Sequence, residues 1–355
     1  MNELRALIDE TAGKIFRDHC TKDLVDEAER GVWPAELWQT LEDAGLTRAA
    51  VPENLGGSGG TLADAMTVLR QAGRHAAPLP LAETFLAGWI LSQAGCAVPE
   101  GPITIALGES RDALALLPQG DDLWSLSGTA RRVAWASEAP TIVFAVVHGP
   151  DTFAAILDRA ALRIEPGENI AGEPRDTVYV EDVNITSDQI HRLPSSLTLE
   201  RIRELGALTR VELMAGAMRS IMAMTIEHAN TRLQFGRPIG SFQAVRQQLA
   251  VLAGQVAAAG KAADVAVEAA DGGEGSFEIA VAKARVGEAA GIVAGIAHQA
   301  HGAMGITHEH ALHQYTRRLW AWRDEYGSEA VWQTELGRQA AAGGADQLWK
   351  FITAT

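Results

Sequence analysis

The 355-residue chain is long enough for two or three packed regions, and its 47% hydrophobic content is typical of a globular protein. Its net charge of −15 repels phosphate backbones, which argues against nucleic-acid binding. Cys20 and Cys96 lie far apart without a CxxC pattern, which favours a cytoplasmic protein without disulfides or a cysteine metal site. We expect no membrane span, because no segment approaches about twenty uninterrupted apolar residues.

Helical periodicity dominates the first hundred residues. Apolar side chains recur at three- and four-residue spacing in residues 3–16 and 34–46, so both segments are predicted helices. Glycines between residues 56 and 60 predict a loop, and Thr61 with Asp64 predicts a capping box at the next helix. Two prolines then precede a short apolar helix at residues 85–95. These elements predict an N-terminal helical domain over residues 1–100.

The pattern changes between residues 101 and 195. Residues 103–107, 141–147, 153–157 and 177–185 are short runs of β-branched or aromatic residues, divided by Gly, Pro and Asp. We predict a middle β domain here, barrel-like or a sandwich.

Helices return after residue 196. Val211, Met214, Met218 and Ile221 form one apolar stripe, and residues 246–270 and 277–303 are rich in alanine. Such helices usually pack against one another, and small side chains also allow close approach at a subunit interface. The predicted class is therefore mostly α with a small β domain, ending in a four-helix bundle over residues 196–355 that carries the oligomer interface.

The passage TRLQFGRPIGSFQAVRQQLA, residues 231–250, is the most informative. It predicts a helix that ends near Arg232, a Gly-Pro turn, and a new helix capped at Ser241. Taken alone, Arg232 is explained as a cation that complements the C-terminus of a helix dipole.

Four segments together resemble the acyl-CoA dehydrogenase family. Residues 231–250 resemble its Arg-x-Gln-Phe-Gly-x-Pro-Ile-x-x-Phe-Gln signature, and residues 51–73 resemble its Pro-Glu-x-x-Gly-Gly-x-Gly loop. QAHGAMGITHEHALHQYTRR, residues 299–318, resembles its Gln-x-x-Gly-Gly-x-Gly segment, and YVEDVNI, residues 179–185, is similar to its closing β-domain strand. The resemblance extends over the whole chain. It implies α,β-desaturation of an acyl-CoA substrate with FAD, and an electron-transfer flavoprotein as a partner.

The resemblance also implies that FAD is held between subunits. Arg232 and Gln234 are expected to reach the neighbouring subunit's FAD near its pyrophosphate, because a guanidinium matches phosphate oxygens. Phe235 is expected to pack near the cofactor, and Gln243 to hydrogen-bond it. The second signature adds three further expected contacts: Gln299, Gly302 and Ala303, of which Ala303 replaces a family glycine.

The contacts to FAD within the same subunit are eroded. The family's Thr-Glu-Pro-x-x-Gly-Ser-Asp loop is reduced to a trace, residues 108–110. Trp135 and Ser137 are the candidates for the Trp and Thr of its Trp-Ile-Thr strand. Plain core packing is the other interpretation of Trp135.

Both positions that hold the family's catalytic glutamate are vacant. Counting from Gln299 reaches Tyr326, followed by the expected glycine, and counting back from Arg232 reaches Gly206. Tyrosine titrates at about 10, so it is a poorly populated base. Glu325 lies one position off, which turns a helical side chain by about 100°. Glu325 is either a solvated turn residue paired with Arg323, or a relocated base.

The sequence HEHALH contains His308, His310 and His313, but it departs from the zinc-protease pattern HExxH, since Leu312 stands at the second histidine position. We expect turn and surface positions for these residues and no metal site.

Three functions remain open on these observations. The chain is a subunit that completes an FAD site with a paralogous acyl-CoA dehydrogenase chain, as in bacterial heteromers that degrade bulky acyl chains such as steroid side chains. Alternatively, it is a self-sufficient homo-oligomer that uses Glu325 or Tyr326, or a structural relative that binds no flavin.

Overall fold

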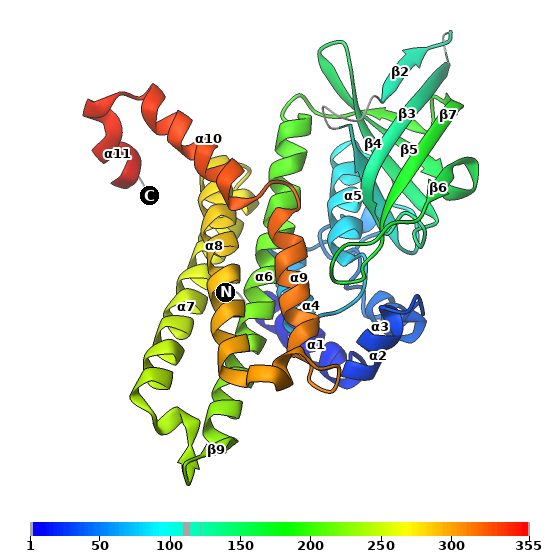
Figure 1. Cartoon of the computed structure of the whole chain (residues 1–355). Coiled ribbons are helices and arrows are strands. Elements are labelled where there is room, and N and C mark those ends of the chain that lie inside the picture. The colour runs from blue at the N-terminus through cyan, green and yellow to red at the C-terminus, as the bar shows by residue number, and fades with distance from the viewer. Residues whose placement is uncertain (1–2, 109–113, 121, 354–355) are drawn as a thin grey trace.

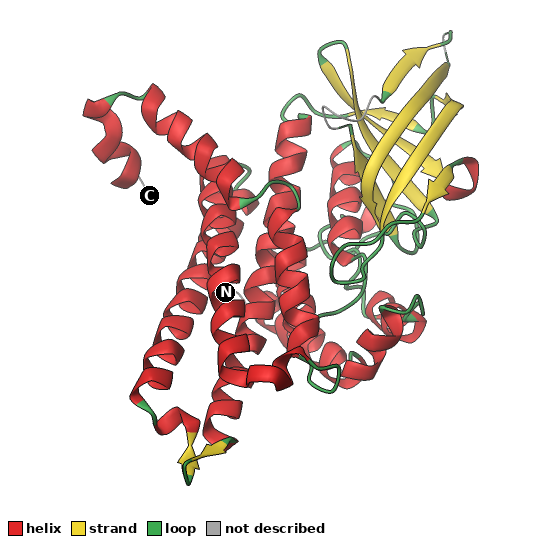
Figure 2. Cartoon of the chain, in the orientation of Figure 1, coloured by secondary structure: helices red, strands yellow, loops and turns green. Residues whose placement is uncertain are grey.

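The computed structural model of the chain describes residues 3–108, 114–120 and 122–353. Helices make up both ends of the chain, and a small β region lies to one side of them (Figures 1 and 2). The predicted class, mostly α with a small β domain, is confirmed. The five N-terminal helices are α1 (Glu3–His19), α2 (Lys22–Ala28), α3 (Ala35–Asp43), α4 (Leu62–Arg74) and α5 (Leu81–Gln93).

The predicted capping box opens α4. The Thr61 hydroxyl accepts from the Asp64 backbone N–H, and the Asp64 carboxylate accepts from the Thr61 N–H at 2.9 Å. Each of these bonds satisfies a backbone donor that a helix start otherwise leaves unpaired. The capping box therefore fixes the backbone where the glycine-rich loop joins α4.

The β region consists of two four-stranded sheets. Their strand orders are β1-β4-β5-β8 and β2-β3-β7-β6, and β1 and β4 are the parallel pair. A separate apolar cluster, with Leu126, Phe144 and Val178 fully buried, fills the space between them. The strands are β1 (Ile103–Leu107), β2 (Ala115–Pro118), β3 (Leu123–Ala134), β4 (Thr141–His148), β5 (Asp151–Asp158), β6 (Arg163–Glu165), β7 (Arg175–Thr186) and β8 (Ile190–Arg192).

The C-terminal helices form a bundle around α6 (Leu199–Thr231). It contains α7 (Gln243–Asp271), α8 (Ser276–His301) and α9 (Leu312–Asp324). The predicted stripe on α6 is buried along its whole length. Helix α10 (Glu329–Ala342) and α11 (Leu348–Thr353) continue away from the bundle (Figure 1). The predicted cap at Ser241 is wrong, because α7 starts two residues later and Phe242 precedes it without a side-chain cap.

The N-terminal helices and the bundle share one apolar core rather than two. Helix α4 crosses α6 at two glycines. A Cβ atom on Gly216 would lie 2.0 Å from the backbone oxygen of Arg70, and one on Gly73 would lie 2.0 Å from that of Leu213. Only glycine allows the two backbones this approach.

Helix α7 is, within the described residues, the one helix that is long and apolar enough to cross a membrane by length and composition alone. The sequence prediction of no membrane span required an unbroken apolar run, so it did not identify α7 as a helix of this kind. Six residues of α7 face the bundle at alternating spacings of three and four: Leu252, Val256, Ala259, Ala263, Ala266 and Ala270. The opposite face is largely exposed in the part of the chain that the structure describes, with Val251 48% exposed.

We expect Gly216→Ala to lower the free energy of unfolding by about 3 kcal/mol, since the added methyl group overlaps a backbone oxygen that can move only with its helix. Gly337→Ala on α10 is the matched control, because nothing lies within 4 Å of its added Cβ. The control should gain up to about 1 kcal/mol from helix propensity. Denaturant unfolding measures both, and equal midpoints would contradict the close crossing.

Candidate functional site

A tight hairpin stands at one end of the bundle. Strands β9 (Leu233–Gln234) and β10 (Arg237–Pro238) are joined by Phe235 and Gly236, with φ of 51° and 77°. Positive φ at both turn positions is the type I′ hairpin geometry, which is costly for a bulky residue such as phenylalanine. Phe235 is nevertheless 90% exposed. The fold therefore displays an aromatic ring here in a strained conformation without burying it.

The polar residues of the first signature surround this hairpin and face outward. Arg232, Gln234 and Gln243 are all exposed. The Arg232 backbone N–H donates to the carbonyl of His228 at 2.9 Å, which closes α6. Within the described residues, the Arg232 guanidinium has no ion pair with a carboxylate of its own chain. It is therefore free to bind a group from outside the chain.

The second signature lies at the same end of the bundle (Figure 1). Gln299, Gly302 and Ala303 are exposed at the end of α8. Gly302 has a φ of 61°, and no atom lies within 4 Å of a Cβ placed on it, so its backbone is open to close approach. The His228 ring of α6 stacks on His301 of α8 with 4.4 Å between centroids. The structure thus brings the two signatures together.

Trp135 points instead into the interior. Its ring is 7% exposed and meets the edge of Trp33 at 6.4 Å between centroids. Core packing, the second interpretation of Trp135, describes its position in the single chain. The Ser137 backbone N–H donates to Asp176 at 2.7 Å. Of the loop trace at 108–110, residues 109 and 110 lie outside the described part of the chain.

Tyr326 and Gly206, the residues that the resemblance assigns to the two base positions, meet each other. Tyr326, with a φ of 55°, lays its ring over Gly206 of α6, and a Cβ on Gly206 would lie 2.4 Å from the Tyr326 ring. The ammonium of Lys283 on α8 donates to the carbonyls of Arg323 and Gly327 at 2.7 Å each, and these two hydrogen bonds fix the turn that contains Tyr326. Burial lowers the pKa of Lys283 to about 7.

Glu325 points inward beside Tyr326 and binds two arginines. Its carboxylate accepts from Arg210 at 2.5 Å and from Arg175 at 2.7 Å, and 19% of the side chain is exposed. The predicted solvated turn residue paired with Arg323 is wrong, since Arg323 binds Glu329 on α10 at 2.8 Å. Glu325 therefore forms largely buried ion pairs with both Arg175 and Arg210.

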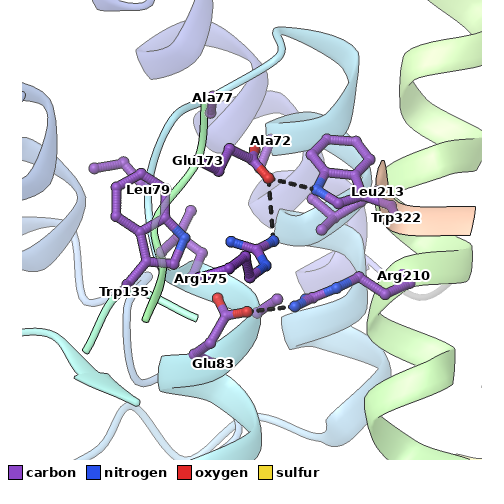
Figure 3. Close-up of a pocket in the computed structure, with 12 residues that line it drawn as sticks. Ala72, Ala77, Leu79, Glu83, Trp135, Glu173, Arg175, Arg210, Leu213 and Trp322 are labelled. Atoms are coloured by element: carbon purple, nitrogen blue, oxygen red, sulfur yellow. Dashed lines mark hydrogen bonds and ion pairs between the residues drawn. The ribbon is translucent and has the colours of Figure 1, made fainter. Parts of the chain in front are cut away.

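The ion pairs continue through the interior (Figure 3). Arg210 also binds Glu83 of α5, and Arg175 binds Glu173 at 3.1 Å. The Glu173 carboxylate accepts from the Trp322 indole at 3.0 Å. We call the set that continues to the α2 end of the chain the buried ion network: Glu29, Glu83, Glu173, Arg175, Arg210, Arg317, Arg318 and Glu325.

The buried ion network leaves little open space. The cavity between Trp135, Arg175 and Arg210 has a volume of about 10 Å³. That is the space of about one water molecule. Neither an isoalloxazine ring nor a thioester fits between these side chains as they stand.

The electrostatics of the turn oppose proton abstraction. Burial would raise the pKa of Glu325, but Arg175 and Arg210 outweigh it and lower the pKa to about 2. Burial raises the pKa of Tyr326 to about 12. A general base works best with a pKa near the operating pH, and these two groups depart from it in opposite directions. The two glutamates of α6 nearest to Gly206 are also paired, because Glu204 binds Arg201 and Glu212 binds Arg70.

The histidines of HEHALH divide between surface and interior. His308 is exposed and His310 is partly buried, whereas His313 is 7% exposed, so its predicted surface position is wrong. No group of metal-binding side chains occurs among the described residues.

Sequence reasoning missed the residues that close the interior, which come from five separate segments. A signal was present for one of them: Glu83 is the single charge within the otherwise apolar helical run LAETFLAGWIL. A charge in such a position is normally buried and paired. Its partner cannot be read from the sequence.

Comparison with known proteins agrees with the fold. Residues 2–97 match the model of the acyl-CoA dehydrogenase N-terminal domain, and residues 201–341 match that of the C-terminal domain. Acyl-CoA dehydrogenase IpdE2 of Mycolicibacterium smegmatis is 28% identical over 326 residues, 90% of this chain and 93% of that protein. IpdE2 of Mycobacterium tuberculosis is 29% identical, over 89% of this chain and 91% of that protein.

Solved structures show the same likeness. The Tcur3481-Tcur3483 steroid ACAD G363A variant superposes with a TM-score of 0.87 at 26% identity, covering 97% of this chain and 99% of that chain. The ChsE4-ChsE5 complex from Mycobacterium tuberculosis superposes with a TM-score of 0.87 at 22% identity, covering 96% and 98%. With the two domain matches spanning both helical regions, the chain belongs to the acyl-CoA dehydrogenase family.

Proposed function

We propose that this chain is the subunit of a heteromeric acyl-CoA dehydrogenase that binds a paralogous subunit's FAD in trans, while its own acyl-CoA site is closed. The observation that carries the proposal is the buried ion network, which fills the space beside Trp135, where the resemblance leads us to expect the flavin. An active site needs that volume open and a carboxylate free of cations.

The in-trans half is built in the opposite way. Its guanidinium, amides and open glycine lie exposed at one end of the bundle, which suits the phosphates of a nucleotide. The residues present therefore fit the pyrophosphate end of FAD, and the interior does not fit its ring system. This division is what a cofactor shared between two different chains requires.

Two names support a heteromer and a bulky substrate. Tcur3481-Tcur3483 and ChsE4-ChsE5 each pair two differently named chains, and the former is called a steroid ACAD. We therefore propose a steroid-derived or similarly bulky acyl-CoA as the substrate class, and an electron-transfer flavoprotein as the electron acceptor.

In this arrangement, Arg232 and Gln234 bind and orient the nucleotide phosphates, and Phe235 packs against the cofactor from the hairpin tip. Gln299 and the Gly302 backbone approach from the second segment. FAD, when bound, supplies the hydride acceptor for the acyl-CoA. The proton acceptor comes from the paralogous chain, because neither Glu325 nor Tyr326 is suited to hold the α-proton at neutral pH.

The self-sufficient alternative requires Glu325 or Tyr326 to act as base. The paired carboxylate and the buried phenol both argue against it. The third alternative, a relative that binds no flavin, leaves the exposed Arg232 and the strained Phe235 without a role.

Flavin retention tests the proposal directly. The chain alone should be colourless, and the complex with its paralogous partner should hold one FAD per pair of chains. Arg232→Ala in the complex should weaken FAD binding by about tenfold or more, because a charge-assisted hydrogen bond contributes about 1.5–3 kcal/mol. Arg192→Ala on β8 is the exposed control and should retain FAD. Stoichiometric FAD on the isolated chain, bleached by acyl-CoA, would show the proposal to be wrong.

The identity of the base is tested by Tyr326→Phe, which removes the hydroxyl and keeps the ring that packs on Gly206. We expect kcat of the complex to stay within about twofold, since a lost general base costs about 10²–10⁴ in rate and this phenol is not one. Stopped-flow flavin reduction measures the step. A fall of the larger size would instead assign proton abstraction to Tyr326.

The pH dependence of stability tests the Glu325 ion pair. Its folded pKa of about 2 lies below the usual 4.5, so its contribution is complete above about pH 4.5 and is lost as the pH falls towards 2. Glu325→Gln should lose about 3 kcal/mol at neutral pH and show a shallower fall in acid. Glu335→Gln on α10 is the control and should unfold like the parent. Urea unfolding at several pH values measures all three, and parallel curves would refute the pairing.

A further inference from the structure

Three imidazoles lie in a row where α6 and α8 end. The His228 and His301 rings stack at 4.4 Å between centroids, and the His301 and His310 rings meet edge to face at 4.7 Å. His301 is 5% exposed, and its two neighbours are partly buried. The row therefore joins α6, α8 and the loop before α9 at one point.

The hydrogen bonds assign neutral forms to two of these rings. His301 Nδ1 lies 2.8 Å from the carbonyl of Ala297, so it carries the proton and Nε2 is a bare lone pair. That Nε2 is buried and has no partner among the described residues. His310 Nδ1 accepts from the Leu312 backbone N–H at 3.0 Å, so it must be unprotonated.

Protonation would disrupt both contacts. A proton on His301 Nε2 would place a buried charge without an acceptor, directly beside two further imidazole rings. A proton on His310 Nδ1 would remove the acceptor of the Leu312 N–H, directly before α9 begins. Burial and the nearby His301 lower the pKa of His310, and burial, His301, His310 and Arg232 lower that of His228.

The surrounding groups do not offset such charges. Arg232 faces the row from α6, and His298 faces it from α8 with a lowered pKa caused by burial and His301. On the far side, His308 meets His313, whose ring contacts Arg317. The nearby carboxylates Glu227 and Glu309 are exposed, and within the described residues neither forms an ion pair with the three rings.

The row also connects the two segments assigned to the cofactor. The carbonyl of His228 accepts the backbone N–H of Arg232, and His301 directly precedes Gly302. The distance between the two segments is therefore set where the His228 and His301 rings touch.

We propose that His228, His301 and His310 form a proton-sensitive clasp, which holds the Arg232 and Gly302 segments in register when neutral and releases them on protonation in mild acid. These are positioning residues and not catalytic ones. The link to the cofactor rests on the proposed function, whereas the clasp itself does not.

Hydrogen–deuterium exchange of the full chain tests the clasp without any cofactor. Between about pH 7.5 and about pH 5.5, opening of residues 226–233 and 298–306 should increase at least about tenfold after correction for intrinsic exchange, because each proton bound on opening contributes up to about tenfold per pH unit. Helix α5 (Leu81–Gln93) should not change, which separates local opening from unfolding.

Matched variants make the measurement decisive. His301→Phe keeps a flat ring that cannot be protonated, so the acid-induced opening should fall to less than about half of the parent response on the logarithmic scale. His228→Phe, on a partly exposed ring, is the second variant if the first does not fold. His191→Gln on β8 should behave as the parent. Equal opening at both pH values in the parent, or an unchanged response in the folded phenylalanine variants, would overturn the clasp.

FAD release from the complex with the paralogous chain tests the link to the cofactor. Release should be faster at the lower pH, and His301→Phe should reduce that dependence to less than about half of the parent's on the logarithmic scale. Release that is pH-dependent to the same degree in parent and variant would overturn the link. If no complex holds FAD, the proposed function fails, and the exchange measurement still decides the clasp.

Discussion

The pairing of Glu325 with Arg175 and Arg210 is the interaction on which the interior of this protein depends. A largely buried carboxylate is costly unless cations and hydrogen bonds compensate it, and here two guanidinium groups do so from β7 and from α6. Glu325 turns inward to these arginines, and Tyr326 follows it in a left-handed conformation that places its ring on Gly206. The turn that carries Glu325 and Tyr326 is therefore tied to α6 by both side chains.

The pairing of arginines differs between the side of the molecule near the β region and the hairpin at the end of the bundle. Towards the β region, arginines and glutamates neutralise one another and exclude all but about one water molecule from the cavity. At the hairpin, Arg232 has no such partner among the residues that the structure describes, and it faces solvent. A guanidinium buried in an ion pair is unavailable to a ligand, whereas an exposed one next to open backbone is suited to an anion.

Local patterns predicted the helices well and the strands less well. The α6 stripe was visible because Met214, Met218 and Ile221 repeat with the period of a helix. Strand β3 was missed because SGTARR, residues 127–132, breaks any β-branched run, although it pairs with β7 along its length. Counting along the two signatures reached Tyr326 and Gly206 separately, and the structure lays the ring of Tyr326 over Gly206. Counting could not place Glu325, whose partners are 150 and 115 residues away and carry no motif.

The proposed loss of the base and the closed cavity are coupled in physical terms. The buried ion network holds four glutamates and four arginines, so its charges balance as they stand. A glutamate at position 326 would add a negative charge against Gly206, next to a network whose charges already balance. Opening the cavity would in turn separate Arg210 from Glu83, and breaking a buried pair costs about 3–5 kcal/mol. One substitution therefore cannot restore a base in this interior. A carboxylate with a raised pKa needs an open site without nearby cations, whereas the ion network needs its carboxylates paired with arginines in a closed space.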